Sequence, residues 1–327
     1  MRILVAGGAG YIGSHFVKQA VKHHQVVVID NLQTGHRQAV AKEATFHQGD
    51  LRDRAFLDQV FAEYRLDACV HFAANSLVAE SMQKPLLYFD NNVSGTIALL
   101  EAMHAHHVRK IVFSSSAAVY GTQEKMPLTE DCATSPENPY GESKLMMERM
   151  MMWADAIHQL RYVSLRYFNV AGAASDATIG EDHRPETHLI PIILQVPLGK
   201  RDKLTIFGND YPTKDGTCVR DYIHIEDLID AHLLALAYLD KNKPSAIFNL
   251  GSENGYSNLE ILEVAKNIIG RPLPFAFGDR RPGDPPRLIA SSAKARDVLG
   301  WSRHRGIEEI VASAWAFHQA HPDGYEE

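Results

Sequence analysis

The chain is poor in cysteine, has no long apolar segment and carries no excess of basic residues. Its only three cysteines, Cys69, Cys132 and Cys218, are odd in number and widely spaced, which excludes a disulfide framework and indicates a reducing compartment. No apolar run approaches the ~18 residues that span a bilayer. Lysine and arginine total 33 against 40 acidic residues, a net charge of −7, which argues against nucleic-acid binding. We expect a cytoplasmic protein without a targeting segment, because a strand pattern already begins at residue 2.

Histidine, by contrast, is abundant, with 17 residues. The densest group is His104, His106 and His107, at the expected end of a helix, where imidazolium suits the negative end of the helix dipole. We find no set of Cys, His, Asp or Glu with metal-ligand spacing in the sequence. No metal is therefore expected.

A dinucleotide-binding fingerprint opens the chain. A strand-length run, 2–6, leads into Gly7-Gly8-Ala9-Gly10-Tyr11-Ile12-Gly13 and then into a helical pattern. Glycines at this point let the backbone turn tightly and approach a pyrophosphate, which the helix N-terminus also favours. A second strand, 26–29, ends in Asp30. Its carboxylate suits a ribose 2′-hydroxyl and would repel a 2′-phosphate, so NAD is predicted rather than NADP. The alternative is a structural glycine turn followed by a chance acid.

Tyr140 and Lys144 form the second informative pair. They stand four residues apart in Asn138-Pro139-Tyr140-Gly141-Glu142-Ser143-Lys144, so a helix would place both side chains on one face. There the ammonium would lower the pKa of the phenol from about 10 toward the working pH. Such a phenol can accept the proton of an alcohol during hydride-transfer oxidation. A tyrosine and a lysine four residues apart are common on solvated helix faces. The pair is informative here because the dinucleotide-binding fingerprint lies in the same expected domain.

Strand-length apolar runs alternate with helical patterns through the first half. We expect strands at 2–6, 26–29, 45–48, 68–72, 110–114 and 162–166, and helices at 53–64, 85–107 and from Tyr140 onward. This alternation predicts an α/β fold with a doubly wound, Rossmann-type parallel sheet covered on both faces. We expect an NAD-binding domain over 1–170 and a smaller α/β substrate lobe, mainly 171–327, with a later strand returning to the main sheet.

Ligands of such folds lie beyond the carboxyl ends of the strands, so the residues that follow each strand are informative. Asp50 and Leu51 follow the third strand and are expected near the adenine. Phe72, Ala73 and Ala74 follow the fourth and are expected near the pyrophosphate and ribose. Ser114, Ser115 and Ser116 end the fifth, where the nicotinamide should lie. A serine run at a strand end is often only a turn, but Tyr140 and Lys144 arrive on the next helix.

Together these segments resemble the extended short-chain dehydrogenase/reductase family, and within it the nucleotide-sugar epimerases, over essentially the whole chain. The matching segments are 7–15, 30–32, 114–121, 138–141, 165–169, 206–211, 219–222 and 280–284. Segment 206–222 with 280–284 is the most specific. The resemblance implies an isomerase that interconverts UDP-glucose and UDP-galactose. It would act by NAD-mediated oxidation at C4, rotation of the 4-ketose and re-reduction on the other face.

The resemblance also implies residue roles. Tyr140 would be the base, Lys144 its electrostatic partner and nicotinamide-ribose ligand, and Ser116 a hydroxyl bridging sugar and tyrosine. Further cofactor contacts would be Asn31, Asn92 and Phe168. The implied substrate contacts are Arg220 and Arg281 on the diphosphate, Asp284 on the uridine ribose, and Asn169, His188, Leu189, Phe207 and Leu288. Solvated loop arginines are the alternative for Arg220 and Arg281, but guanidinium forks suit diphosphate oxygens.

The chain departs from the family pattern at two places. Asn75 and Ser76 stand where some members have a lysine near the cofactor. Leu288 stands where a tyrosine often excludes N-acetylated sugars, so UDP-N-acetylglucosamine becomes a further candidate substrate.

Several alternatives remain open. They are a 4-epimerase of a UDP-pentose or UDP-uronate, and a non-enzymatic NAD sensor. A 4,6-dehydratase is disfavoured because Ala117 and Ala118 replace the expected acid pair. We also expect a homodimer through a four-helix contact, from an excess of apolar residues on two helices: Leu99, Leu100, Met103, Met146, Met147, Met150 and Met151.

Overall fold

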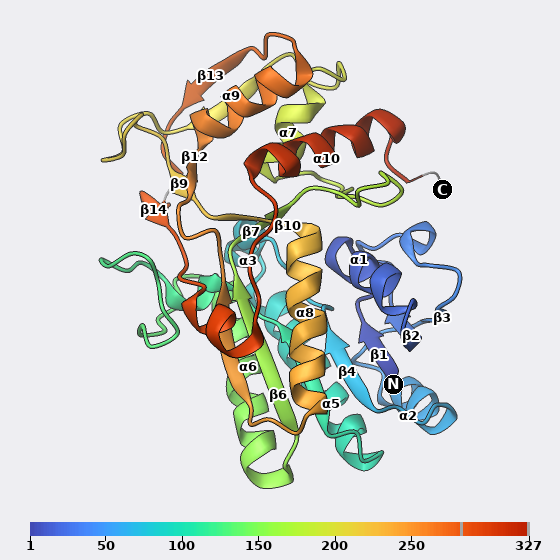
Figure 1. Ribbon diagram of the computed structural model, residues 1–327. Coiled ribbons are helices and arrows are strands. Elements are labelled where there is room, and N and C mark those ends of the chain that lie inside the picture. Colours follow the sequence, from blue (N-terminus) through green and yellow to red (C-terminus); the bar gives the residue numbers. More distant parts are fainter. Residues whose placement is uncertain (282–283, 326–327) are drawn as a thin grey trace.

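A computed structural model describes residues 1–281 and 284–325 of the chain (Figure 1). Pro282 and Gly283, from the middle of the expected substrate segment 280–284, lie outside the described residues. No helix in the described ranges is both long enough and apolar enough to cross a membrane.

A seven-stranded sheet forms the centre of the molecule. Its order is β11-β6-β5-β4-β1-β2-β3, and every neighbouring pair is parallel. The strands are β1 (Arg2–Ala6), β2 (Gln25–Asp30), β3 (Thr45–Gln48), β4 (Ala68–His71), β5 (Lys110–Ser114), β6 (Arg161–Tyr167) and β11 (Ala246–Leu250). The predicted doubly wound parallel sheet is confirmed. Strand β11 returns from late in the sequence to pair with β6, and the order reverses direction between β1 and β4, where such folds bind ligands.

Helices cover both faces because alternate strand residues point to opposite sides. Ile3 and Val5 pack in one core with α1 (Tyr11–Ala20) and α8 (Ile225–Asp240). Leu4 packs in a second core with α2 (Arg54–Glu63), α5 (Gly95–Ala105) and α6 (Pro139–His158). The helix expected over 85–107 is instead three consecutive pieces: α4 (Pro85–Tyr88), a π-helical stretch η2 (Phe89–Ser94) and α5.

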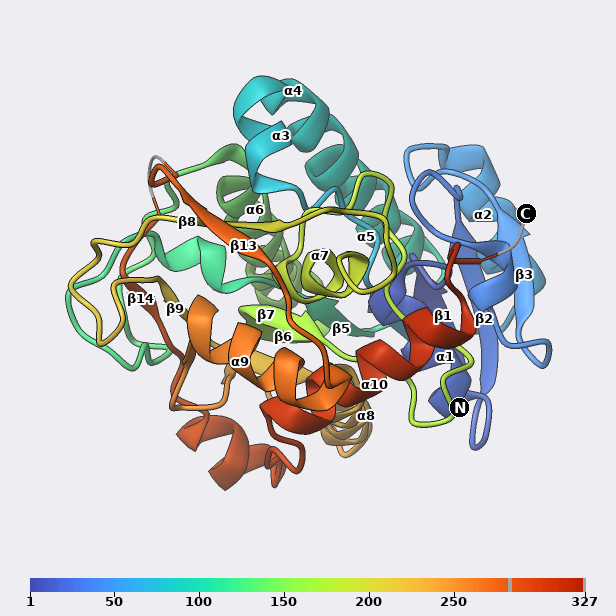
Figure 2. The ribbon, with the colours of Figure 1, turned by 90° about the horizontal axis from the view of Figure 1, so that it is seen from above.

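The remaining elements gather mostly at one end of the sheet (Figure 1). Helices α7 (Leu189–Gln195), α9 (Asn258–Ile269) and α10 (Ile307–Ala320) share an apolar core there. Figure 2 shows α9 and α10 side by side. The short strands are β7 (Asn169–Ala171), β8 (Leu204–Phe207), β9 (Val219–Arg220), β10 (Tyr222–His224), β12 (Tyr256–Ser257), β13 (Phe275–Gly278) and β14 (Arg287–Leu288), and the short helices are α3 (Val78–Gln83), η1 (Arg37–Ala39), η3 (Ala117–Tyr120) and η4 (Ala295–Leu299).

A buried ion pair ties α6 to the sheet. Arg166 Nε, in β6, donates to Glu148 Oε1, in α6, over 2.9 Å, and both side chains are only 4% exposed. Ser115 Oγ, just beyond β5, donates to the same carboxylate. Arg166 Nη1 donates to the Tyr120 hydroxyl over 2.9 Å, and that hydroxyl donates to Asn249 Oδ1 in β11 over 2.7 Å. The network therefore sets the position of α6 against the ends of three strands.

Removing the charge of Glu148 should destabilise the fold. Glu148→Gln leaves the Arg166 guanidinium buried without a compensating charge, so we expect a loss of about 3 kcal/mol in the free energy of unfolding. Arg149→Gln, on the exposed face of the same helix, should change it by less than about 0.5 kcal/mol. Urea denaturation measures both, and equal midpoints for the two variants would contradict the assignment.

Candidate active site

Gly7 and Gly10 in the loop between β1 and α1, and Gly13 in the first turn of α1, are under different constraints. Gly7 has φ +79°, and a Cβ there would lie 2.5 Å from the Ala73 nitrogen. A Cβ on Gly13 would lie 2.0 Å from the Gly7 carbonyl oxygen. The fold itself therefore requires both glycines. For Gly10, which caps α1 in an extended conformation, the nearest atom to a Cβ is 3.6 Å away. Internal packing does not explain Gly10, whereas a pyrophosphate approaching the helix N-terminus does.

The two residues after Gly10 turn toward the protein. The Tyr11 hydroxyl donates to the Gly172 carbonyl oxygen over 2.8 Å, and the Ile12 side chain packs against the core under α1 and α8. The side chains of Tyr11 and Ile12 therefore hold the loop in place. We expect these two residues to contact a cofactor through their backbone amides at the start of α1.

Asp30 ends β2 beside this loop. Its Oδ2 accepts from the Ala9 amide over 2.9 Å, and its Oδ1 accepts from the Leu32 amide over 2.8 Å. Burial raises the pKa of Asp30, while these amides act in the opposite direction. An ionised carboxylate offers about four acceptor positions, so the Asp30 carboxylate keeps acceptor capacity for a ribose hydroxyl. Asn31 Nδ2 donates to Asp50 Oδ2 over 3.2 Å, which joins the ends of β2 and β3.

The Asp50 carboxylate is already paired within the protein. Arg52 Nε donates to Asp50 Oδ1 over 2.9 Å, and hydrogen bonds from Arg52 lower the pKa of Asp50. The Leu51 side chain packs into the core with α2 and α5. Contact of Asp50 and Leu51 with an adenine ring stays a prediction.

The segment after β4 is held by Asn92 in η2. The amides of Phe72 and Ala73 both donate to the Ala6 carbonyl, over 2.8 and 3.0 Å, and Ala74 follows directly. The Asn75 amide donates to Asn92 Oδ1 over 2.8 Å, and Asn92 Nδ2 donates to the Asn75 carbonyl over 3.1 Å. π-helical turns of this kind are frequent at functional sites.

The side-chain amides of Asn92 and Asn75 differ in whether they have a hydrogen-bonding group free for a ligand. Asn92 Nδ2 also donates to Ser143 Oγ in α6, over 2.9 Å, so this amide joins the β4 loop to the helix of Tyr140. Asn75 Nδ2 is buried and has no hydrogen bond to any described residue. A buried donor without a partner is costly. Asn75 Nδ2 therefore suits an oxygen of a bound cofactor.

Tyr140, Lys144 and Ser116 meet at the carboxyl end of β5. Tyr140 and Lys144 lie on one face of α6, with the Lys144 ammonium 5.9 Å from the centre of the tyrosine ring. Lys144 Nζ donates to the Ser114 carbonyl over 2.9 Å. Ser116 caps η3 and hydrogen-bonds to Tyr140, which lowers the pKa of the phenol. The structure thus brings together the three residues expected to act on the substrate.

The pKa of Tyr140 differs from the expectation. Burial raises the pKa of Tyr140 above 10, and Ser116 is the residue that opposes this rise. Burial also lowers the pKa of Lys144 to about 7, opposed by Glu148. The ammonium points at the Ser114 carbonyl and not at the phenol oxygen. The prediction that Lys144 lowers the pKa of this tyrosine is therefore wrong for the chain alone, because desolvation outweighs the neighbouring charge.

The Ser114 hydroxyl is already hydrogen-bonded within the protein. Its Oγ lies 2.7 Å from the Tyr167 hydroxyl and 3.1 Å from His232 Nε2. Burial lowers the pKa of His232 to about 4, so this imidazole is neutral near pH 7.

Phe168, the next residue after β6, packs against the cluster that contains η3. Sequence reasoning missed His232 and Glu148, although Glu148 stands one helical turn after Lys144.

Arg220 and Asp284 lie together in the second lobe. Arg220, in β9, has a side chain that is 13% exposed, and its Nη2 lies 3.2 Å from Asp284 Oδ1. Its Nη1 donates to the carbonyls of Val219 and Pro285. Leu288, in β14, pairs in register with Arg220. A largely buried guanidinium in this setting is not a solvated loop arginine.

Arg281 is held by stacking. Its guanidinium lies 4.2 Å from the centre of the Phe207 ring, at the end of β8. Asn169, in β7, donates from Nδ2 to the Asp221 carbonyl over 3.3 Å. Arg220 is thus held by several contacts, whereas Arg281 is exposed and stacks on Phe207; guanidinium groups suit recognition of an anion.

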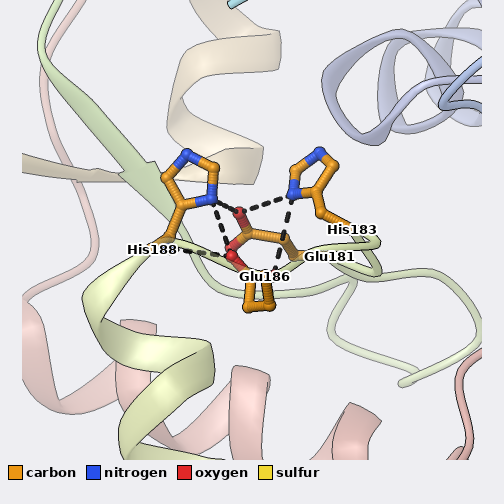
Figure 3. A group of neighbouring side chains, drawn as sticks. All are labelled: Glu181, His183, Glu186 and His188. Carbon is orange, nitrogen blue, oxygen red and sulfur yellow. Dashed lines mark hydrogen bonds and ion pairs between the residues drawn. The ribbon is translucent and has the colours of Figure 1, made fainter. Parts of the chain in front are cut away.

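His188 caps α7, and Leu189 begins it. The Leu189 side chain packs on the core of the second lobe. His188 Nδ1 lies 2.8 Å from Glu181 Oε1 and 2.9 Å from Glu186 Oε1 (Figure 3). These carboxylates raise the pKa of His188 to about 10. The imidazole is therefore turned toward its own loop.

The expectation that no metal is bound stays a prediction, but the fold brings together one group of side chains that could hold an ion. Glu181, His183, Glu186 and His188 offer one ligand atom each, all within 4.8 Å of one another. Their signal in the sequence is Glu-x-His-x-x-Glu-x-His within eight residues. It falls in a segment without helix or strand, where spacing alone does not predict which side chains converge.

The glycine loop generates a test that separates folding from cofactor binding. Gly10→Ala should leave the unfolding temperature almost unchanged, because a Cβ there meets no close protein atom. It should weaken retention of a bound dinucleotide by at least 10-fold, because the methyl group occupies the path of the pyrophosphate. Gly13→Ala should instead destabilise the fold, since the Cβ clashes with backbone. Thermal unfolding and dinucleotide content after gel filtration measure both, and full retention in Gly10→Ala would contradict the assignment.

The chain is similar over its whole length to known enzymes. It is 58% identical to the UDP-glucose 4-epimerase of Lacticaseibacillus casei, with 99% of each chain covered. A crystal structure of a UDP-glucose 4-epimerase matches it with a TM-score of 0.98 and 51% identity over 100% of both chains. The UDP-glucose 4-epimerase of Bifidobacterium longum, solved in complex with NAD+ and UDP, matches with a TM-score of 0.94 and 38% identity over 99% of this chain and 100% of the other.

The family model described as the NAD dependent epimerase/dehydratase family matches residues 3–251. That stretch includes the dinucleotide loop, the Ser116–Tyr140–Lys144 group and Arg220. The chain therefore belongs to the NAD dependent epimerase/dehydratase family.

Proposed function

We propose that this enzyme interconverts UDP-glucose and UDP-galactose by inverting C4 of the hexose. The observation that carries the proposal is the meeting of Tyr140, Ser116 and Lys144 at the sheet end beside the dinucleotide loop, in a chain that also presents Arg220 and Arg281. The full-length similarity to UDP-glucose 4-epimerases supports it. The cofactor is NAD, as in the family, and Asp30 at the end of β2 favours the unphosphorylated ribose.

Tyr140 acts as the base that takes the proton of the 4-hydroxyl and later returns it. Ser116 is placed to bridge the substrate hydroxyl and the phenol. Because burial raises the pKa of Tyr140, its ionisation needs more positive charge beside it than Lys144 supplies in the chain alone. Bound NAD would supply a hydride acceptor for C4 and a cationic ring near the phenol. The phenolate is then favoured when the cofactor is oxidised, which is when a base is needed.

Inversion requires that the oxidised sugar present its other face while the nucleotide stays bound. Arg220 and Arg281 suit this division of roles, because guanidinium groups can grip diphosphate oxygens with several hydrogen bonds. Arg220 Nη1 is held by two backbone carbonyls, and Arg281 is stacked on Phe207. Both are preorganised, so the diphosphate can serve as the fixed point about which the sugar turns.

A tyrosine variant tests the base. Tyr140→Phe should lower kcat for UDP-galactose by about 10²–10⁴-fold, as loss of a general acid–base group does. Its NAD content and its affinity for UDP should remain close to those of the wild type. Tyr238→Phe, on α8 away from the site, serves as the matched control and should retain full activity. An active Tyr140→Phe enzyme would refute the assignment of the base.

We also propose that the sugar pocket accepts UDP-N-acetylglucosamine. Leu288 pairs with Arg220 across β14 and β9, so it lies beside the expected diphosphate group. Leucine is smaller than the tyrosine frequent at this position and cannot donate a hydrogen bond.

Leu288→Tyr should therefore lower kcat/KM for UDP-N-acetylgalactosamine by at least about 10-fold while changing that for UDP-galactose by less than about threefold. Turnover of both sugars by each protein, followed by separation of the 4-epimers, measures this ratio. Wild-type turnover of the N-acetylated sugar thousands-fold below that of UDP-galactose would rule out the broader specificity.

The other functions considered have less support. A 4,6-dehydratase would need an acid and a base next to Ser116, where η3 provides Ala117 and Ala118. A non-enzymatic NAD sensor has no use for the meeting of Ser116, Tyr140 and Lys144. Transient absorbance of reduced NAD on addition of a UDP-sugar distinguishes the enzyme from a sensor. Activity on UDP-pentoses and UDP-uronates is measured in the same 4-epimer assay.

We further propose a homodimer through α5 and α6, on a set of residues that shares only Met146 with the set expected from the sequence. Leu99, Met103, Met147 and Met151 are fully buried in the monomer core, so they explain no interface. Leu100 and Met150 are partly buried against the same core. The exposed apolar residues on these helices are Ile97, Met146, Met152, Trp153 and Ile157. Met146, Trp153 and Ile157 recur at intervals that place them on one face of α6.

Two further proposals concern organisation and location. We propose the division into an NAD-binding part, 1–170, and a substrate part, mainly 171–327, with α8 and β11 contributed back to the first. We propose a cytoplasmic location, which the three unpaired cysteines support.

A further inference from the structure

Four side chains from one short segment before α7 converge on a single point. Glu181, His183, Glu186 and His188 each direct one potential ligand atom inward, and these atoms lie within 4.8 Å of one another. Figure 3 shows that both imidazoles present Nδ1 to the carboxylates, while their Nε2 atoms point away. The group is outside the proposed catalytic centre.

The separations within this group match those of a tetrahedral metal site. Glu181 Oε1 lies 2.8 Å from His188 Nδ1 and 3.2 Å from His183 Nδ1. Glu186 Oε1 lies 2.9 Å from His188 Nδ1, and its Oε2 lies 3.7 Å from His183 Nδ1. A tetrahedral ion with bonds of about 2.0–2.2 Å needs ligand atoms roughly 3.3–3.6 Å apart. These four separations bracket that distance, and because the ligand atoms of the whole group lie within 4.8 Å of one another, the widest pairs would move closer together around an ion.

The two buried carboxylates of this group favour the binding of a cation. The side chains of Glu181 and Glu186 are 4% and 6% exposed, and both carboxylates approach the same nitrogen of His188. Two carboxylates sharing a site repel each other. His183 Nδ1 is buried and has no hydrogen bond of good geometry to any described residue. A nitrogen of this kind, next to two carboxylates, is a suitable metal ligand.

We propose that Glu181, His183, Glu186 and His188 bind one zinc ion through two imidazole nitrogens and two carboxylate oxygens. Nitrogen and oxygen donors in a tetrahedral arrangement suit Zn²⁺ better than Mg²⁺ or Ca²⁺, which prefer more oxygen ligands. Four protein ligands complete the coordination shell, so the ion is structural and leaves no open position for catalysis. The proposal does not depend on the proposed function.

The position of the site indicates what the ion would stabilise. The Gly180 amide donates to the Tyr325 hydroxyl over 3.0 Å, and the Tyr325 amide donates to Asp182 Oδ2 over 3.0 Å. The ring of His183 packs edge-on against Tyr11 of the dinucleotide loop, with ring centres 6.3 Å apart. At the other end, His188 caps α7. The ion would thus fix the start of α7, where substrate contacts are expected, relative to the cofactor loop.

Metal content and zinc affinity test the proposal. Untagged wild-type protein, freed of loosely bound metal by gel filtration, should contain one zinc per chain by inductively coupled plasma mass spectrometry. After stripping with a chelator, it should rebind one equivalent in competition with a chromogenic chelator. His183→Gln should lower this affinity by at least about 100-fold, more than the loss of an outer-shell partner does. Zinc should raise the unfolding temperature of the wild type by roughly 5 °C and leave that of His183→Gln unchanged.

His104→Gln combined with His158→Gln is the matched control. These two rings lie 4.1 Å apart on the surface and could collect adventitious zinc, so their removal should leave the tight equivalent in place. If His183→Gln does not fold, His188→Gln, whose side chain is 43% exposed, provides the same comparison. Equal zinc affinity in the wild type and the ligand variant, or no stoichiometric zinc in the wild type at micromolar concentration, would overturn the proposal. The four residues would then be an ion-pair cluster only.

Discussion

The Glu148–Arg166 ion pair is the constraint on which the geometry of the candidate site depends. Both side chains are almost fully buried, so neither charge can be left alone without a large desolvation cost. Because Glu148 lies one turn after Lys144, its position on α6 also sets where Lys144 and Tyr140 face. The links through Ser115 and Tyr120 extend the same constraint to the end of β5 and to β11.

This arrangement explains why the pKa of Tyr140 is raised in the chain alone. Lys144 donates to the Ser114 carbonyl, and burial disfavours charge on both residues of the pair. A base that becomes charged only beside a cationic cofactor is useful to an enzyme that must first remove a proton and then return it.

The second lobe contributes rigidity of a different kind. Its short strands hold Arg220 by backbone carbonyls and Arg281 by an aromatic ring, and Asp221 joins them to the sheet. The Asp221 carboxylate accepts from the Ser252 and Ala290 amides, while its carbonyl accepts from Asn169. In the proposed function, Arg220 and Arg281 would hold the diphosphate while the sugar turns. The Glu181–His188 segment would add a further anchor at the start of α7.

Local patterns determined much of this protein. The glycines before α1, Asp30 after β2 and the spacing of Tyr140 and Lys144 are short-range features, so the sequence alone predicted the doubly wound sheet and the residues at its carboxyl edge. The pKa of Tyr140, the burial of Met147 and Met151, and the convergence of Glu181, His183, Glu186 and His188 depend on packing between distant segments. Only the tertiary structure decided these, because desolvation and the direction of each side chain are set by neighbours that lie far away along the chain.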